Sequence, residues 1–135
     1  MGYDYPQKVL FKHCDPAGIV FYPRYFEMIN DCVEAFFDQV LDYPFETLLQ
    51  SAGVPTAEIQ TRFLAPSRHG DALVLTLVGV RSGTKSFTLT ITANCGDETR
   101  FTATSTLVYT DAKGASQPWP KAVKSKLDAF TGEST

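Results

Sequence analysis

Two different periods of hydrophobic and polar residues run along this chain of 135 residues. From Pro23 onward the apolar residues are spaced by three and four: Phe26, Ile29, Val33, Phe36 and Val40. Acidic residues repeat the same steps on the opposite side: Glu27, Asp31, Glu34 and Asp38. This spacing predicts a helix of about five turns with one apolar stripe. It begins at Pro23, where a missing N–H is harmless, and ends before Pro44.

Most of the chain after Gly53 alternates with a period of two, which is typical of strands that have one covered face. Four strands, joined largely by hairpins, are predicted there over residues 56–64, 72–80, 87–93 and 101–109. Shorter predicted elements are a first strand at 7–12 and helices at 45–52 and 121–130. Trp119, between two prolines, is predicted to anchor the C-terminal tail.

The order of these elements predicts an α+β fold class. A helix with one apolar stripe and an antiparallel sheet of roughly five strands can each cover the other, if the sheet wraps around the helix. One domain over residues 1–135 is expected, with residues 113–135 as a tail. Open sheet edges and a threonine-rich outer face favour pairing with further copies, as a dimer or a tetramer.

Composition narrows the class of protein. A hydrophobic fraction of 44% with 20% charged residues is typical of a soluble globular domain. The net charge of −3 provides no long-range attraction for nucleic acid or an anionic membrane. No apolar run approaches the ~18–20 residues of a membrane span. Three cysteines without CxxC spacing favour neither disulfides nor zinc, and indicate a cytoplasmic protein.

The segment before the long helix carries the candidate chemistry. It places a carboxylate, Asp15, in a loop that leads directly into a helix start. Free N–H groups at a helix start stabilise developing negative charge and can form an oxyanion hole. A carboxylate beside them can attack a carbonyl carbon or activate water. Gly18 would allow a ligand close to the backbone, and Ile19, Val20 and Phe21 would exclude water.

The segment from Asp15 to Tyr25 closely resembles the signature of the 4-hydroxybenzoyl-CoA thioesterase family of hot-dog proteins. The resemblance implies hydrolysis of an acyl-CoA thioester without metal or cofactor, in a site between two subunits. It implies that Asp15 is the catalytic carboxylate and that the Tyr22 backbone N–H polarises the thioester carbonyl. It also implies contacts to the CoA arm from Lys85, Ser86 and Phe87, which can serve the Asp15 of a partner subunit.

Some positions depart from that family's hydroxybenzoyl-specific member. Phe21 replaces a tryptophan, and Gly83-Thr84 replaces an arginine pair, which leaves Arg81 as the nearest guanidinium for CoA phosphates. Phe21 and Glu58 are predicted to contact the substrate. The acyl group is expected to be aromatic or short-chain.

Several alternatives remain open at this point. Asp15 would act as the nucleophile or as a general base, and Glu34 and Glu58 are rival carboxylates. His13 is expected to be solvated or hydrogen-bonded; with Asp15 it would instead suit a dehydratase or hydratase of the same fold. A non-catalytic acyl-CoA-binding protein is the third alternative, although a pure binder gains nothing from a carboxylate beside the carbonyl.

Overall fold

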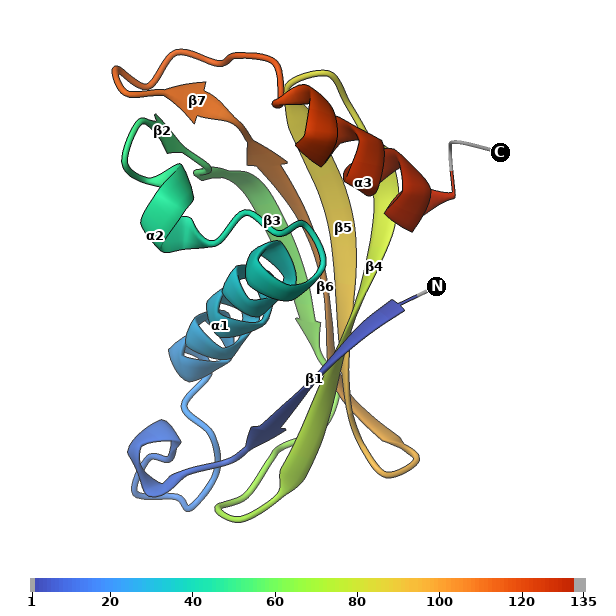
Figure 1. Ribbon diagram of the computed structural model, residues 1–135. Coiled ribbons are helices and arrows are strands. Elements are labelled where there is room, and N and C mark those ends of the chain that lie inside the picture. Colours follow the sequence, from blue (N-terminus) through green and yellow to red (C-terminus); the bar gives the residue numbers. More distant parts are fainter. Residues whose placement is uncertain (1, 133–135) are drawn as a thin grey trace.

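The computed structural model describes residues 2–132, which form an antiparallel sheet curved around a long helix (Figure 1). In spatial order the five strands are β1 (Gly2–Lys8), β4 (Ala72–Ser82), β5 (Ser86–Cys95), β6 (Glu98–Val108) and β3 (Thr56–Phe63). All neighbours in this sheet pair antiparallel. Two short strands, β2 (Ala52–Gly53) and β7 (Thr110–Asp111), form a separate pair. The predicted α+β class is confirmed.

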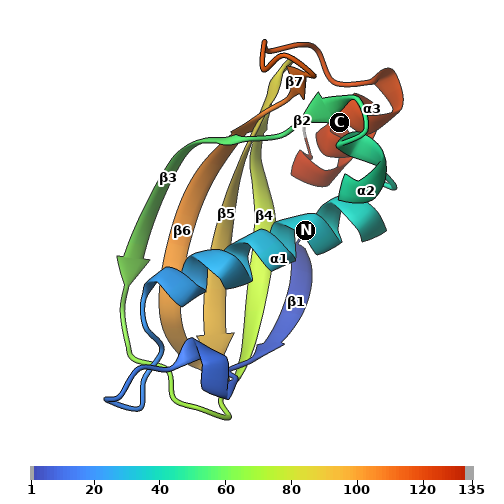
Figure 2. The same cartoon turned by 90° about the vertical axis from the view of Figure 1, so that its left-hand side faces the viewer.

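Helix α1 (Pro23–Gln39) lies against the concave side of the sheet (Figures 1 and 2). Its start at Pro23 and its end before Pro44 confirm the prediction from periodicity. The buried members of its apolar stripe are Tyr25, Met28, Ile29, Cys32, Val33, Phe36 and Phe37. The Phe36 ring stacks on Phe87 of β5, with ring centres 5.8 Å apart and planes 6° apart. Burying an aromatic side chain of this kind stabilises the fold by about 2–3 kcal/mol.

The pleat of the sheet separates an inner apolar face from an outer polar one. On β4 and β5 the fully buried inner residues include Leu73, Leu75, Leu77, Leu89 and Ile91. The residues between them on the central strands are mainly threonines: Thr76, Thr88, Thr90, Thr92, Thr102, Thr104 and Thr106. Threonine suits this partly exposed face because its β-branched side chain packs well on a pleated surface.

The predicted first strand, residues 7–12, is wrong in position. The strand β1 covers Gly2–Lys8, and Phe11–His13 form a single 3-10 turn, η1. Tyr3 and Tyr5 are half-buried on the inner side, so the alternating pattern begins earlier than predicted. Pro6 is compatible with this strand because β1 lies at the edge of the sheet and donates few ladder hydrogen bonds.

The expected chain of hairpins holds only for β4–β5 and β5–β6. Strand β3 pairs with β6 at the far edge, so residues 64–71 cross from β3 to β4 beneath the start of α1 (Figure 1). Helix α2 (Phe45–Leu48) is shorter than the predicted helix at 45–52, because Ala52–Gly53 pair with β7 instead.

The C-terminal segment packs on the inner side of β4 through helix α3 (Lys121–Thr131), which confirms the predicted helix. A Cβ atom on Gly79 of β4 would lie 2.5 Å from Thr131 Cγ2, so glycine at this position allows α3 to approach the strand closely. Trp119 is buried and stacks on Tyr109 at 4.8 Å, as expected of an anchor. The predicted domain of residues 1–135 includes residues 1 and 133–135, which lie outside the described residues. No helix within residues 2–132 has the length and apolar character to cross a membrane.

Candidate active site

Asp15 opens a narrow hairpin-like loop in front of α1. The Asp15 N–H donates to Ile19 O at 3.0 Å, and the Gly18 N–H donates to Asp15 O at 2.9 Å. Gly18 has a φ of 80°, in the left-handed region that completes this type of three-residue loop. Proline at the second position of the turn fixes its own φ. The loop therefore holds the Asp15 backbone in one position.

The two carboxylate oxygens of Asp15 differ in their surroundings. Oδ1 accepts a 2.9 Å hydrogen bond from the Ala17 N–H, which fixes the orientation of the side chain. Oδ2 has no hydrogen-bond partner within residues 2–132. The side chain is partly exposed, so one oxygen orients the group while the other is free to meet a ligand.

The start of α1 presents one backbone donor. Residue 23 is a proline and has no N–H, while the Arg24 and Tyr25 N–H groups donate to the carbonyls of Phe21 and Tyr22. The Tyr22 N–H has no acceptor among the described residues. It is therefore a first-turn donor that remains able to bind a carbonyl oxygen.

His13 stabilises the chain on both sides of this loop through hydrogen bonds. Its imidazole is only 4% exposed, and Nδ1 accepts a 2.9 Å hydrogen bond from the Leu10 N–H. Its carbonyl accepts the Phe21 N–H at 2.9 Å. Burial, and then the positive charge of Lys12, hold the pKa of His13 below its ordinary value of 6.5. His13 is thus hydrogen-bonded rather than solvated, and its Nδ1 is not available as a base.

The connection at residues 64–71, which crosses from β3 to β4, is hydrogen-bonded to both the Asp15 loop segment and helix α1. Ser67 is fully buried; its carbonyl accepts the Val20 N–H at 2.8 Å, and its hydroxyl accepts the Tyr25 hydroxyl at 2.9 Å. Arg100 Nη1 donates to Ser67 Oγ at 3.1 Å and to Asp71 Oδ2 at 2.8 Å. The hydrogen bond from Arg100 holds the pKa of the Asp71 carboxyl below its usual range.

Sequence reasoning missed Ser67 and Arg100. The hydrogen bonds of this network join residues that are 29 to 47 positions apart, so no local spacing connects them. The one available signal is an arginine near the start of a strand whose later residues are all small or apolar.

Exposed aromatic side chains surround the Tyr22 N–H. Phe21, Tyr22 and Phe63 are 45–58% exposed, and the rings of Tyr22 and Phe63 meet edge to face at 5.8 Å. A cleft of about 280 Å³ borders Tyr22 and Phe63 and is here called the aromatic cleft; its lining residues are Ile19, Val20, Tyr22, Tyr25, Phe63, Leu64, Ala65 and Pro66. An apolar ligand surface thus lies directly beside the free backbone donor.

The predicted CoA-contacting residues lie at the other end of the sheet. Tyr25 packs on Phe101, whereas Ser86 pairs with Val108, seven residues further along β6. At about 3.3 Å per residue this separation is roughly 23 Å. Arg81 and Lys85 are exposed near the same end as Ser86. Within one chain these three residues cannot contact a thioester carbonyl that is held by the Tyr22 N–H.

Two predicted substrate contacts need correction. The Phe87 side chain is fully buried and stacks on Phe36, so its ring belongs to the core and is closed to CoA. Glu58 pairs with Thr106 on the outer face of the sheet, away from α1, because a bulge after Thr56 shifts the alternation. It lines neither the aromatic cleft nor the space beneath α1. Glu34, the other rival carboxylate, is exposed on α1.

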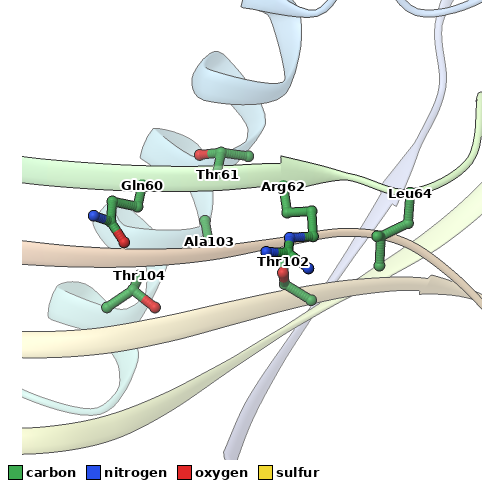
Figure 3. A pocket seen from close by; sticks show the side chains of 7 residues that line it. All are labelled: Gln60, Thr61, Arg62, Leu64, Thr102, Ala103 and Thr104. Atoms are coloured by element: carbon green, nitrogen blue, oxygen red, sulfur yellow. The ribbon is translucent and has the colours of Figure 1, made fainter.

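The outer face also carries a broad hollow of about 740 Å³ beside the β3 edge. Figure 3 shows that Gln60, Arg62, Thr102 and Thr104 project to this face, while Thr61 and Ala103 project to the side of α1. This hollow lies on the opposite side of the sheet from the loop of Asp15. Within residues 2–132, no cluster of three or more histidine, cysteine or acidic side chains is placed to hold a metal ion.

Comparison with solved structures supports the fold over its whole length. Gentisyl-coenzyme A thioesterase superposes with a TM-score of 0.85 at 25% identity, over 93% of this chain and 99% of that one. A 1,4-dihydroxy-2-naphthoyl-CoA thioesterase from Synechocystis superposes with a TM-score of 0.86 at 16% identity, over 94% and 96%. These likenesses confirm the predicted hot-dog fold.

Comparison of sequences defines the family. The 1,4-dihydroxy-2-naphthoyl-CoA hydrolase of Thermosynechococcus vestitus is 34% identical over 93 residues. The match covers 66% of this chain and 62% of that relative, which is less than two thirds of its length. A family model described as the thioesterase-like superfamily matches residues 9–127. This match covers most of the chain, which therefore belongs to the thioesterase-like superfamily.

Proposed function

We propose that this protein hydrolyses acyl-CoA thioesters, with Asp15 as the catalytic carboxylate. The observation that carries the proposal is the pairing of two unsatisfied groups on one rigid segment: Asp15 Oδ2 in the loop and the Tyr22 N–H at the helix start. Membership of the thioesterase-like superfamily supports the same reaction, as do the names of the three similar proteins described above, which are CoA thioesterases or hydrolases.

In this reaction the thioester oxygen accepts the Tyr22 N–H, which stabilises the negative charge that develops on that oxygen. Removal of one such donor typically costs about 3–4 kcal/mol of transition-state stabilisation. Gly18 leaves open space beside the loop, since no atom lies within 4 Å of a Cβ at that position. Phe21, with its exposed ring, would contact the acyl-CoA beside the carbonyl.

Asp15 can act by two routes. As the nucleophile, its oxygen bonds to the carbonyl carbon, the carbon–sulfur bond breaks, CoA leaves as thiolate, and water hydrolyses the resulting mixed anhydride. As a general base, Asp15 takes a proton from water while the water oxygen attacks the carbon. The proton then passes to the departing thiolate. Neither route requires a metal or a cofactor, and the reaction would take place in the cytoplasm.

We further propose a homodimer or homotetramer with the active site shared between subunits. Of the two sheet edges, β1 carries Pro6 and Lys8, which discourage strand pairing, whereas β3 exposes Ile59 and Phe63. A second copy pairing antiparallel at β3 would bring its Lys85 end beside the Asp15 end of the first. Arg81, Lys85 and Ser86 would then contact the CoA arm of the partner's substrate.

The acyl group would be aromatic or short-chain. The similar proteins are named for gentisyl-CoA and dihydroxynaphthoyl-CoA, which carry aromatic acyl groups. The exposed aromatic rings of the cleft suit such groups.

The structure weakens the dehydratase alternative. That chemistry would use His13 as the base, but its Nδ1 is committed to the Leu10 N–H and the ring is buried. A non-catalytic acyl-CoA binder is disfavoured by the free carboxylate oxygen beside the carbonyl site, because burying a charge without a role weakens binding.

The direct test is an assay of the purified protein with a panel of acyl-CoA esters. Thiol release is followed with a colorimetric reagent, and dehydration of β-hydroxyacyl-CoA is followed in parallel. Thiol release with at least one ester, and no dehydration, is the expected result. Dehydration without thiol release would favour the hydratase alternative, and binding without either reaction would favour the binder.

A further inference from the structure

The turn between β4 and β5, residues 83–85, is held by the C-terminal part of the chain; we refer to it as the β4–β5 turn. The Trp119 N–H donates to Thr84 O at 3.1 Å, and its indole Nε1–H donates to Ser86 O, at the start of β5, at 3.1 Å. Figure 1 shows α3 beginning beside this end of β4 and β5. One side chain with its own backbone therefore binds two carbonyls of the turn region.

The indole of Trp119 is itself fixed by the core. It is buried, stacks on Tyr109 with ring centres 4.8 Å apart, and lies 6.2 Å from the Phe37 ring of α1. A buried tryptophan N–H needs a hydrogen-bond partner, and here that partner is the Ser86 carbonyl. The β4–β5 turn is thus joined through one rigid side chain to the C-terminal end of α1.

Helix α3 holds the last residue of β4, directly before the turn. Lys124 Nζ donates to Ser82 O at 3.0 Å and to Ser82 Oγ at 2.9 Å, and it pairs with Asp128 Oδ1 at 2.7 Å. The Ser82 hydroxyl also donates to Asp128 Oδ1 at 2.7 Å. Both ends of the β4–β5 turn are therefore fixed to the C-terminal segment, Ser82 by α3 and Ser86 by Trp119.

The turn exposes the groups that the C-terminal segment does not bind. The Lys85 carbonyl accepts the Tyr109 N–H at 2.8 Å, whereas the Lys85 side chain is exposed. The backbone N–H groups of Thr84 and Lys85 have no acceptor within residues 2–132. The carbonyls of the turn are thus occupied within the fold, while its donors remain free for the oxygen atoms of a ligand.

We infer that Trp119 and Lys124 are positioning residues for CoA binding, because they fix the two ends of the turn that carries Lys85. The inference rests on the proposed function, in which Lys85 and Ser86 contact the CoA arm. A turn that is already fixed loses less conformational freedom when it binds a ligand, so it binds more tightly. Trp119 is buried and acts through the turn, not by contact with the reacting atoms. Its loss should therefore weaken binding of the CoA arm and leave the chemical step unchanged.

The test compares two thioesters that share an acyl group and differ in the length of the arm. Benzoyl-CoA, or whichever ester of the panel is hydrolysed fastest, is compared with the same acyl group on pantetheine, which lacks the phosphates and the nucleotide. The variant Trp119→Phe keeps a ring against Tyr109 and removes the Nε1–H donor.

In Trp119→Phe, KM for the CoA ester should rise roughly 5- to 10-fold, with kcat within about two-fold of the wild type. Both constants for the pantetheine ester should stay unchanged, because that ester does not reach the β4–β5 turn. KM does not depend on the fraction of protein that is folded, so a loss of stability alone does not produce this result. An unchanged KM for the CoA ester, or an equal rise for both esters, would overturn the inference.

Gln117→Leu is the matched control. The Gln117 side chain donates to Thr110 O at 2.9 Å, so this variant also removes one hydrogen bond from a side chain of the same segment to a backbone carbonyl, but one outside the turn. It should lose comparable stability and keep the wild-type KM for both esters. A rise in KM like that of Trp119→Phe would mean that general loosening of the segment is responsible, and would overturn the role of Trp119.

Two lysines of α3 give a second test, which does not depend on the folding of Trp119→Phe. Lys124 donates to Ser82 O beside the turn, whereas Lys126 donates to Leu41 O at 3.3 Å, after the end of α1. Lys124→Met should raise KM for the CoA ester alone, and Lys126→Met, which removes the same charge, should not. Equal effects of the two variants would indicate an effect of charge, and would overturn the role of Lys124.

Coupling to Lys85 tests the route of the effect. In a Lys85→Ala background, Trp119→Phe should raise KM for the CoA ester by a smaller factor than in the wild type, because the group that it positions is already absent. The same factor in both backgrounds would overturn the inference.

The affinity for CoA itself, measured by calorimetry, separates this inference from the proposed function. If no ester releases thiol, but CoA binds and Trp119→Phe weakens its binding, the proposed hydrolysis fails and the positioning role holds. If esters are hydrolysed and Trp119→Phe binds CoA as tightly as the wild type, only the positioning role fails. If the wild type binds no CoA, both fail.

Discussion

The Tyr25 hydroxyl, on the first turn of α1, donates a 2.9 Å hydrogen bond to the Ser67 hydroxyl in the connection between β3 and β4. The Ser67 carbonyl accepts the Val20 N–H, immediately after the loop of Asp15. One buried serine therefore holds both the segment that carries the carboxylate and the helix start that carries the free N–H. The relative position of these two groups depends on it.

The substitution Tyr25→Phe tests this positioning role. It should lower kcat by roughly 10-fold with little change in KM, and reduce the free energy of unfolding by about 1 kcal/mol. The matched control is Tyr43→Phe, which removes a 2.8 Å hydroxyl contact with Tyr109 elsewhere in the fold. The control should lose similar stability and keep its kcat. Equal losses of kcat in both variants would show that Tyr25 has only a structural role.

Gly18→Ala should distort the loop of Asp15. A φ of 80° costs a residue with a Cβ about 1–2 kcal/mol, and the space around it is open, so the effect comes from the backbone alone. Gly114 has a φ of 90° and equally open surroundings, which makes Gly114→Ala the matched control. Both variants should lower the Tm by similar amounts, measured by circular dichroism, and only Gly18→Ala should lower kcat. Unchanged turnover in Gly18→Ala would contradict the assigned role of the loop.

Part of this architecture could be predicted from local spacing. The helix beginning at Pro23 follows from steps of three and four, and the strands β4, β5 and β6 follow from strict alternation. The loop of Asp15 is recognisable from the sequence because the residues of its signature are consecutive. In each case the residues that predict the feature all lie within the helix, strand or loop that they predict.

Features that depend on distant segments were not predictable. The crossing at residues 64–71 results from which strands pair, and Ser67 gains its role only when that connection meets α1. The family resemblance places Phe87 in contact with CoA, but the inner face of β5, which carries its side chain, belongs to the core. The Glu58 side chain lies on the outer face because a bulge in β3 shifts the alternation of that strand. Nothing in the sequence indicates this bulge.

The buried imidazole of His13 should make stability depend on pH. Burial holds its pKa in the folded protein below 6.5, so the unfolded chain takes up a proton first as the pH falls. The contribution to stability is complete above pH 6.5 and is lost as the pH decreases toward the lowered pKa. The Tm of wild-type protein should thus fall more steeply between about pH 7 and 5 than that of His13→Asn. His69→Asn, at an exposed position, should follow the wild type; a parallel profile for His13→Asn would contradict this account.

Shared active sites can be tested by mixing subunits. If Asp15 and Lys85 of different subunits serve one site, Asp15→Asn and Lys85→Ala proteins should each be impaired alone. Mixed dimers would combine both changes in one site and leave the other site intact. After unfolding and refolding together in equal amounts, about a quarter of the sites should be wild-type. No recovery of kcat/KM above that of the separate variants would indicate that Lys85 does not act across the interface.

Asp15 Oδ2 and the Tyr22 N–H lie on one short segment, and neither has a hydrogen-bond partner among residues 2–132. The most direct measurement is steady-state thiol release by Asp15→Asn, compared with Asp97→Asn in the exposed β5–β6 turn. Asp15→Asn should lower kcat by roughly 100- to 10,000-fold while Tm and CoA affinity stay near the wild-type values, and Asp97→Asn should retain full activity. Turnover by Asp15→Asn within a few-fold of the wild type would contradict the account.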